Sequence, residues 1–187
     1  MYTQAMVNFT TFDDLKRFSK DITINERELM KSSSSSKSNK DTFLSHSSKD
    51  TEYLPAVIQL LENHGASVYC DLGDERMPDD PSPETAKIIK NQIHESRRLV
   101  LFITTNSKNS KWVPWELGVG DSSLSTLNVA LLPVASNSAE QSWAKQEYLG
   151  LYRHIVWGRM KGVPNSLWMV YDYHDNTATK LIDWLKS

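Results

Sequence analysis

LVLFI, residues 99–103, is apolar at every position. A strand with one face in solvent alternates apolar and polar side chains, whereas a strand covered on both faces is a continuous apolar run. A second run of this kind, VALLPV, spans residues 129–134. The two runs predict central strands of a parallel sheet that carries helices on both faces.

Shorter strand and helix patterns alternate around these two runs. Further strands are predicted over residues 42–45, 66–71 and 154–157, with 167–173 as an additional candidate. Helices are predicted near residues 54–61, 83–93, 113–121, 140–152 and 178–185, the first of them capped by Asp50. Strand–helix alternation implies right-handed crossovers and helices on both sheet faces. The sequence therefore predicts an α/β fold, a doubly wound, flavodoxin-like sheet of five parallel strands.

The first forty residues have a different character. SSSSSKSNK, residues 32–40, cannot bury apolar area and predicts a flexible linker. Before it, in an N-terminal extension over residues 1–31, apolar side chains recur at nearly helical spacing between positions 12 and 22. We expect a short amphipathic helix there. Docking on the main domain, residues 41–187, is favoured over docking on a partner or partial disorder.

Composition excludes several classes of protein. The 21 basic and 23 acidic residues nearly cancel, to a net charge of −2, and no basic tract predicts nucleic-acid binding. No apolar run approaches the length of a membrane span, and the N-terminus lacks the order of a signal peptide. The single cysteine, Cys70, excludes an internal disulfide and a multi-cysteine metal site. We expect a cytosolic protein without a bound metal.

The expected strand ends place several polar residues together. Ligands of open parallel sheets bind outside the carboxyl ends of the strands. Ser45 and His46 end the first predicted strand, Asp71 ends the second, and Thr105 follows the central one. These residues should converge on one edge of the sheet and are candidate ligand contacts.

Glu116 and two tryptophans follow that central strand. If Pro114 is the first helical residue, Glu116 is the third, and its carboxylate faces the same edge. Trp112 lies one turn earlier, so an indole and a carboxylate can share a patch suited to a sugar-linked aromatic cation. A glutamate at the third helical position also often caps its own helix. Trp112 and Trp115 by themselves are more often core or interface residues than ligand contacts, so the residues alone leave both interpretations open.

Three segments resemble the Toll/interleukin-1 receptor (TIR) domain family. DTFLSHSSKD, residues 41–50, is similar to its opening strand and loop. SVYCDLGDERMPDDPSPETAKIIKNQI, residues 67–93, is similar to the second strand, BB loop and next helix of bacterial members. SKWVPWELG, residues 110–118, resembles the family's WxxxE motif, Trp112 to Glu116. The resemblance is strong up to about residue 121 and does not include the first forty residues.

The resemblance implies a TIR fold and an NAD⁺-cleaving enzyme with Glu116 as its catalytic residue. The resemblance also implies that NAD⁺ is the substrate and that no separate cofactor is needed. The residues that would contact NAD⁺ are the other candidates, Ser45, His46, Asp71, Thr105, Trp112 and Trp115. Standalone bacterial members resemble the TIR component of Thoeris-like antiphage defence, whose cyclic or otherwise modified ADP-ribose activates a second protein. Related enzymes complete their sites by assembling through the BB loop, which implies self-association.

One carboxylate is sufficient for this chemistry. Glycosidases commonly need two, but nicotinamide leaves NAD⁺ as a neutral molecule and needs no general acid. A carboxylate held near the ribose can stabilise the developing cation. No Gly-rich dinucleotide fingerprint follows any predicted strand.

Two other functions are compatible with the same residues. The first is a non-catalytic TIR scaffold or host-mimicking effector that acts by binding other TIR domains. The second, a nucleotide synthase or nuclease, is disfavoured by the near-neutral charge. Glu116 favours the enzyme, since a pure scaffold has no need of that carboxylate.

Overall fold

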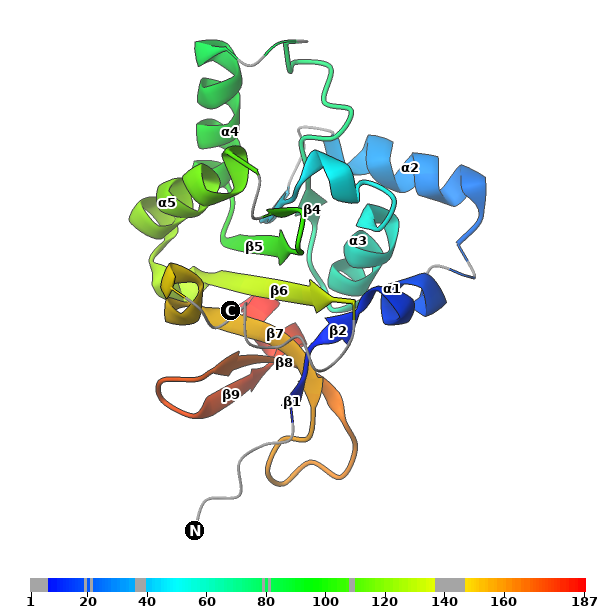
Figure 1. The fold of residues 1–187 in the computed structure, drawn as a ribbon, viewed down its shortest axis with the longest axis vertical. Helices are drawn as coiled ribbons and strands as arrows, with labels where there is room; N and C mark the ends of the chain where they lie inside the picture. Colours follow the sequence, from blue (N-terminus) through cyan, green and yellow to red (C-terminus); the bar gives the residue numbers. More distant parts are fainter. Residues whose placement is uncertain are drawn as a thin grey trace.

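A single sheet with helices on both faces forms the centre of the molecule (Figure 1). The computed structural model describes residues 7–18, 20, 22–35, 40–78, 80, 82–107, 110–136 and 147–187. The strands are β1 Val7–Asn8, β2 Thr10–Thr11, β3 Thr42–Ser45, β4 Val68–Tyr69, β5 Arg98–Ile103, β6 Val129–Ala135, β7 Arg153–Gly158, β8 Leu167–Asp172 and β9 Thr177–Lys180. The helices are α1 Phe12–Phe18, α2 Ile24–Ser35, α3 Leu54–Asn63, α4 Pro83–Glu95, α5 Trp112–Leu124 and α6 Leu181–Lys186.

Five parallel strands in the order β4-β3-β5-β6-β7 confirm the doubly wound α/β prediction. The sheet nevertheless has more than five strands, because β8 and β9 extend it with antiparallel pairs. The predicted last helix was too long: Ala178 lies in β9, where it pairs with Tyr171, and α6 begins at Leu181. Its β-branched neighbours Thr177 and Thr179 suit a strand, so pairing with β8 outweighs the helical spacing.

The two faces of the sheet carry separate apolar clusters, and β5 contributes to both. Val100 and Phe102 pack in the cluster that includes α1, α3 and α6. Leu99, Leu101 and Ile103 pack in the cluster that includes α4 and α5. All six positions of β5 are buried. This two-sided burial is the reason that residues 99–103 form an uninterrupted apolar run.

Helix α5 lies unusually close to the sheet at Gly120. A Cβ atom at this position would lie 2.1 Å from Leu99 Cδ2 of β5. A larger residue at this position would force the Leu99 side chain or the helix to shift. Glycine therefore favours the close packing of α5, the helix that carries Glu116, on β5.

The N-terminal extension docks on the sheet, as predicted, but through more than a helix. Strand β2 pairs parallel with β6, and β1 pairs antiparallel with β7. The fully buried Leu15 of α1 joins the core cluster of α3. The two strands were not predicted, since two-residue strands carry no periodicity that a sequence can show.

The serine-rich segment is not a linker throughout. Ser32 to Ser35 form the last turn of α2, and the Cys70 amide donates a 3.2 Å hydrogen bond to the Ser34 carbonyl. The linker prediction is wrong for these residues, because backbone contact with the sheet edge orders a segment without apolar side chains. Residues 36–39 lie outside the described residues, and the domain boundaries at 31 and 40 stay predictions.

The helix predicted over residues 140–152 falls largely outside the described part of the chain. Its last residues, Glu147–Leu151, form a 3₁₀ helix. Among the described residues, no helix has both the length and the apolar character that crossing a membrane requires.

Candidate active site

Glu116 and Ser45 meet at the carboxyl end of the sheet. Ser45 is the last residue of β3, and its Oγ donates a short hydrogen bond to Glu116 Oε2. Both side chains are buried, and Glu116 is only 4% exposed. The two residues are 71 positions apart in the sequence, so only the fold brings them together.

The start of α5 decides where Glu116 points. The helix begins at Trp112, and the Val113 amide donates to Ser110 Oγ at 3.2 Å. Glu116 is therefore the fifth helical residue, and the prediction that Pro114 comes first is wrong. Proline is tolerated within the first turn, where no amide is needed. A carboxylate in the second turn is past the capping position, and Glu116 instead reaches across to β3.

Burial changes the protonation of Glu116. Removal from water, and next the negative charge of Asp71, raise the pKa of this carboxyl to about 8, while the hydrogen bond from Ser45 acts in the opposite direction. At neutral pH the group is therefore largely protonated. A cationic ligand placed beside it would favour the carboxylate.

His46 and Asp71 complete the cluster at this edge. His46 Nδ1 lies 3.5 Å from Asp71 Oδ1, and the side chains are 5% and 36% exposed. Asp71 follows β4 closely, as His46 follows β3. The structure thus brings together four of the predicted site residues, Ser45, His46, Asp71 and Glu116.

The loop after Asp71 is held by a buried carboxylate that the sequence analysis missed. Tyr69 Oη donates to Asp74 Oδ2 at 2.7 Å, and Arg76 Nε donates to Asp74 Oδ1 at 2.8 Å. Although burial opposes ionisation, the hydrogen bonds from Arg76 and Tyr69 lower the pKa of Asp74. The one feature of the sequence that could have indicated this contact is the spacing of five residues between Tyr69 and Asp74.

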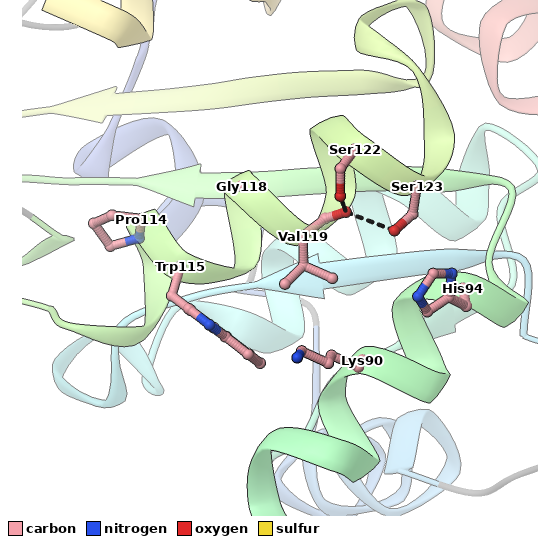
Figure 2. Close-up of a pocket in the computed structure, with 8 residues that line it drawn as sticks. All are labelled: Lys90, His94, Pro114, Trp115, Gly118, Val119, Ser122 and Ser123. Carbon is pink, nitrogen blue, oxygen red and sulfur yellow. Dashed lines mark hydrogen bonds between the residues drawn. The ribbon is translucent and has the colours of Figure 1, made fainter.

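The two tryptophans differ in their relation to the carboxylate: Trp112 is one helical turn before Glu116 in α5, so a shared patch stays a prediction, whereas Trp115 lies elsewhere. Trp115 lines a groove between α4 and α5 (Figure 2), and Glu116 is not among the residues that line it. Successive helical residues diverge by about 100°, which separates these two neighbours. Trp112 is half-buried and makes an edge-to-face contact with Trp115, with ring centroids 5.3 Å apart.

The turn after β5 supplies a structural network. Thr105 is exposed, whereas its neighbour Thr104 is buried and donates to Asp50 Oδ2 at 2.7 Å. Asn106 Nδ2 donates to Asp50 Oδ1 at 2.6 Å. Asp50, the last residue of the 3₁₀ helix after β3, therefore joins that helix to the turn after β5. The prediction that it caps α3 is wrong, since the cap position is Tyr53.

No group of three or more histidine, cysteine or acidic side chains within the described residues is arranged to hold a metal ion. The chemistry available at the strand ends is that of a buried carboxyl, a serine hydroxyl and a histidine–aspartate pair.

Comparison with known proteins identifies relatives of this arrangement. The profile of a family described as TIR domain matches residues 42–165, which include Ser45, Asp71 and Glu116. "Probable 3' cyclic ADP-D-ribose synthase ThsB'" of Bacillus cereus (strain MSX-D12) is 36% identical over 132 residues, 69% of this chain and 67% of that protein. "Putative cyclic ADP-D-ribose synthase TIR2" of Cytobacillus dafuensis is 34% identical over 80 residues, 41% of this chain and 21% of that protein.

Proposed function

Because the chain belongs to the TIR domain family, we propose that it is an NAD⁺ nucleosidase that breaks the nicotinamide–ribose bond and forms a cyclic ADP-ribose. The observation that carries this proposal is Glu116, a buried carboxyl that accepts a hydrogen bond from Ser45 at the sheet edge instead of capping its helix. The names of the two relatives support the class of product.

The proposed reaction needs little from the protein beyond a placed negative charge. The bond between ribose and nicotinamide breaks with both electrons going to nicotinamide, which departs neutral. The positive charge that develops on the ribose is stabilised by the Glu116 carboxylate. A nucleophilic group within the same molecule then bonds to the ribose carbon and releases its proton, which closes the ring, whereas attack by water with loss of a proton would give linear ADP-ribose.

Ser45, His46 and Asp71 have supporting roles in this proposal. The hydrogen bond from Ser45 orients Glu116, and we propose that His46 and Asp71, which lie 3.5 Å apart, contact the ribose and phosphates. The cation of NAD⁺ favours ionisation of a carboxyl that is protonated in the free protein. Since Glu116 is almost fully buried, the residues that cover it have to move before ribose can reach it, and we propose that self-association drives this movement.

The biological setting is part of the same proposal. We infer that the product is a signal for a second protein in antiphage immunity, and that the chain acts in the cytoplasm. The 36% identity to ThsB', which is named as a probable cyclic ADP-D-ribose synthase, supports a cyclic product as that signal.

The test is incubation of the purified chain with NAD⁺, with chromatography and mass spectrometry of the products. We expect the wild type to release nicotinamide together with a product one water lighter than ADP-ribose, and Glu116→Gln to release neither. Circular dichroism and a melting curve show whether the variant is folded. An absence of nicotinamide at high protein concentration, with crowding agents to promote assembly, would identify a scaffold instead.

A further inference from the structure

The groove between α4 and α5 has the composition of a second ligand site. It is an open groove with a volume of about 720 Å³, within the range of small-molecule sites. Trp115, Gly118, Ser122 and Ser123 of α5 line one side, and Lys90 and His94 of α4 line the other (Figure 2). We propose that this α4–α5 groove binds an anionic ligand that contains a planar ring with N–H donors, the chemical class of a nucleotide.

The first argument is charge. Lys90 and His94 are one helical turn apart on α4, and both are exposed. No carboxylate occurs among the described residues that line the groove, although the whole chain carries a net charge of −2. A phosphate in this groove therefore meets a cation without a competing anion.

The second argument is the indole of Trp115. It forms a wall of the groove, with Lys90 Nζ 5.6 Å from the ring centroid. At this distance the contact is near the limit of a cation–π interaction, so the ammonium can turn to a phosphate while the indole stacks on a base. At Gly118 the space where a Cβ would lie is open, with no atom within 4 Å. A flat ring can therefore approach the helix backbone closely.

The third argument is the hydrogen-bonding state of the two serines. Ser122 Oγ donates to the Val119 carbonyl at 3.0 Å, and Ser123 Oγ donates to the same oxygen at 2.7 Å. Each hydroxyl has used its proton and keeps lone pairs that can accept. Acceptors on one side and the Lys90 ammonium on the other match a base with N–H groups that is linked to a phosphate.

A protein partner fits the groove less well. The large exposed apolar side chains of the described chain lie elsewhere: Ile24, Leu29, Leu127, Leu151, Trp157 and Ile182. The groove offers one partly buried indole among polar groups, a pattern that suits a small polar ligand.

Binding of adenosine monophosphate to full-length Glu116→Gln protein tests the proposal without turnover. Calorimetry gives the affinity, and ¹⁵N spectra of the indoles show which tryptophan responds. We expect Trp115→Leu and Lys90→Met each to weaken binding by about tenfold. Lys87→Met, a matched change on the same helix outside the groove, should leave the affinity unchanged. The result does not depend on whether the chain cleaves NAD⁺.

Three results would overturn the proposal. Equal affinity of Lys90→Met and Lys87→Met for adenosine monophosphate would show that the phosphate does not bind in the groove. Adenosine or inorganic phosphate that binds as tightly as the monophosphate would show that ring and anion are not recognised together. A change in sedimentation of the groove variants, without a change in nucleotide affinity, would assign the surface to contact between copies. Melting temperatures establish that each variant is folded.

Discussion

Two buried carboxylates lie at the same edge of the sheet and differ in their hydrogen bonds. Asp50 is fully buried and accepts one bond on each oxygen, from Thr104 and from Asn106. Glu116 is almost as buried, and its one side-chain hydrogen bond within the described structure comes from Ser45. Asp71 adds a negative charge near Glu116 and raises its pKa further.

The difference separates a structural group from a reactive one. Both oxygens of Asp50 accept hydrogen bonds from the chain itself, so this carboxylate links the segments that follow β3 and β5. Few of its lone pairs remain for a ligand. Glu116 has a poorly compensated carboxyl, which is costly to ionise until a cation arrives. Incomplete hydrogen bonding is therefore what makes Glu116, and not Asp50, the candidate for catalysis.

The largest effect should come from removing the charge of Glu116. We expect Glu116→Gln to lower kcat/KM for NAD⁺ by more than about 100-fold, because the amide keeps the shape but cannot offset the ribose cation. Nicotinamide release measured over a range of NAD⁺ concentrations gives this ratio. A variant with more than a tenth of the wild-type activity would show that the carboxylate is not the reactive group.

The matching change at Asp50 should affect stability instead. Asp50→Ala leaves the donors of Thr104 and Asn106 without their acceptor, and we expect a loss of about 2–4 kcal/mol in the free energy of unfolding. Urea denaturation at pH 7 measures it, with Glu116→Ala as the comparison. If Glu116→Ala lowers the free energy of unfolding as much as Asp50→Ala does, the two carboxylates have the same structural role.

The pH dependence of stability sharpens the comparison. The Glu116 carboxyl has a pKa of about 8 in the folded chain against an ordinary value of 4.5. Between these values the folded state holds the proton that the unfolded state has lost, so stability falls as pH rises. The free energy of unfolding of Glu116→Gln lacks this decrease. We therefore expect it to rise relative to that of the wild type between pH 5 and pH 8, by on the order of a few kcal/mol. Parallel curves for the two proteins would contradict the raised pKa.

The smallest effects should come from the neighbours of Glu116. The charge of Asp71 raises the pKa of Glu116 and the hydrogen bond from Ser45 lowers it. We therefore expect Asp71→Asn to move the rise of kcat/KM with pH to lower values, and Ser45→Ala to move it to higher values. Shifts of the same sign in both variants would show that another group controls the profile.

Much of the fold was predictable because burial leaves a pattern in the sequence. The uninterrupted runs 99–103 and 129–134 indicated strands covered on both faces, which are β5 and β6. Local signals were less dependable where tertiary contacts compete with them. Ala178 pairs in β9 instead of starting a helix, and the end of α2 includes serines that contact the sheet edge at Cys70.

The sequence by itself determined the alternation of strands and helices, the edge at which polar residues gather, and Glu116 as the residue of interest. The tertiary structure decided that Glu116 lies in the second turn of α5, that Ser45 is its hydrogen-bond donor, and that Trp115 faces a different groove. It also decided that burial and the charge of Asp71 raise the pKa of this carboxyl. Burial and charge act through space, between residues that lie far apart in the chain, and no local pattern records them.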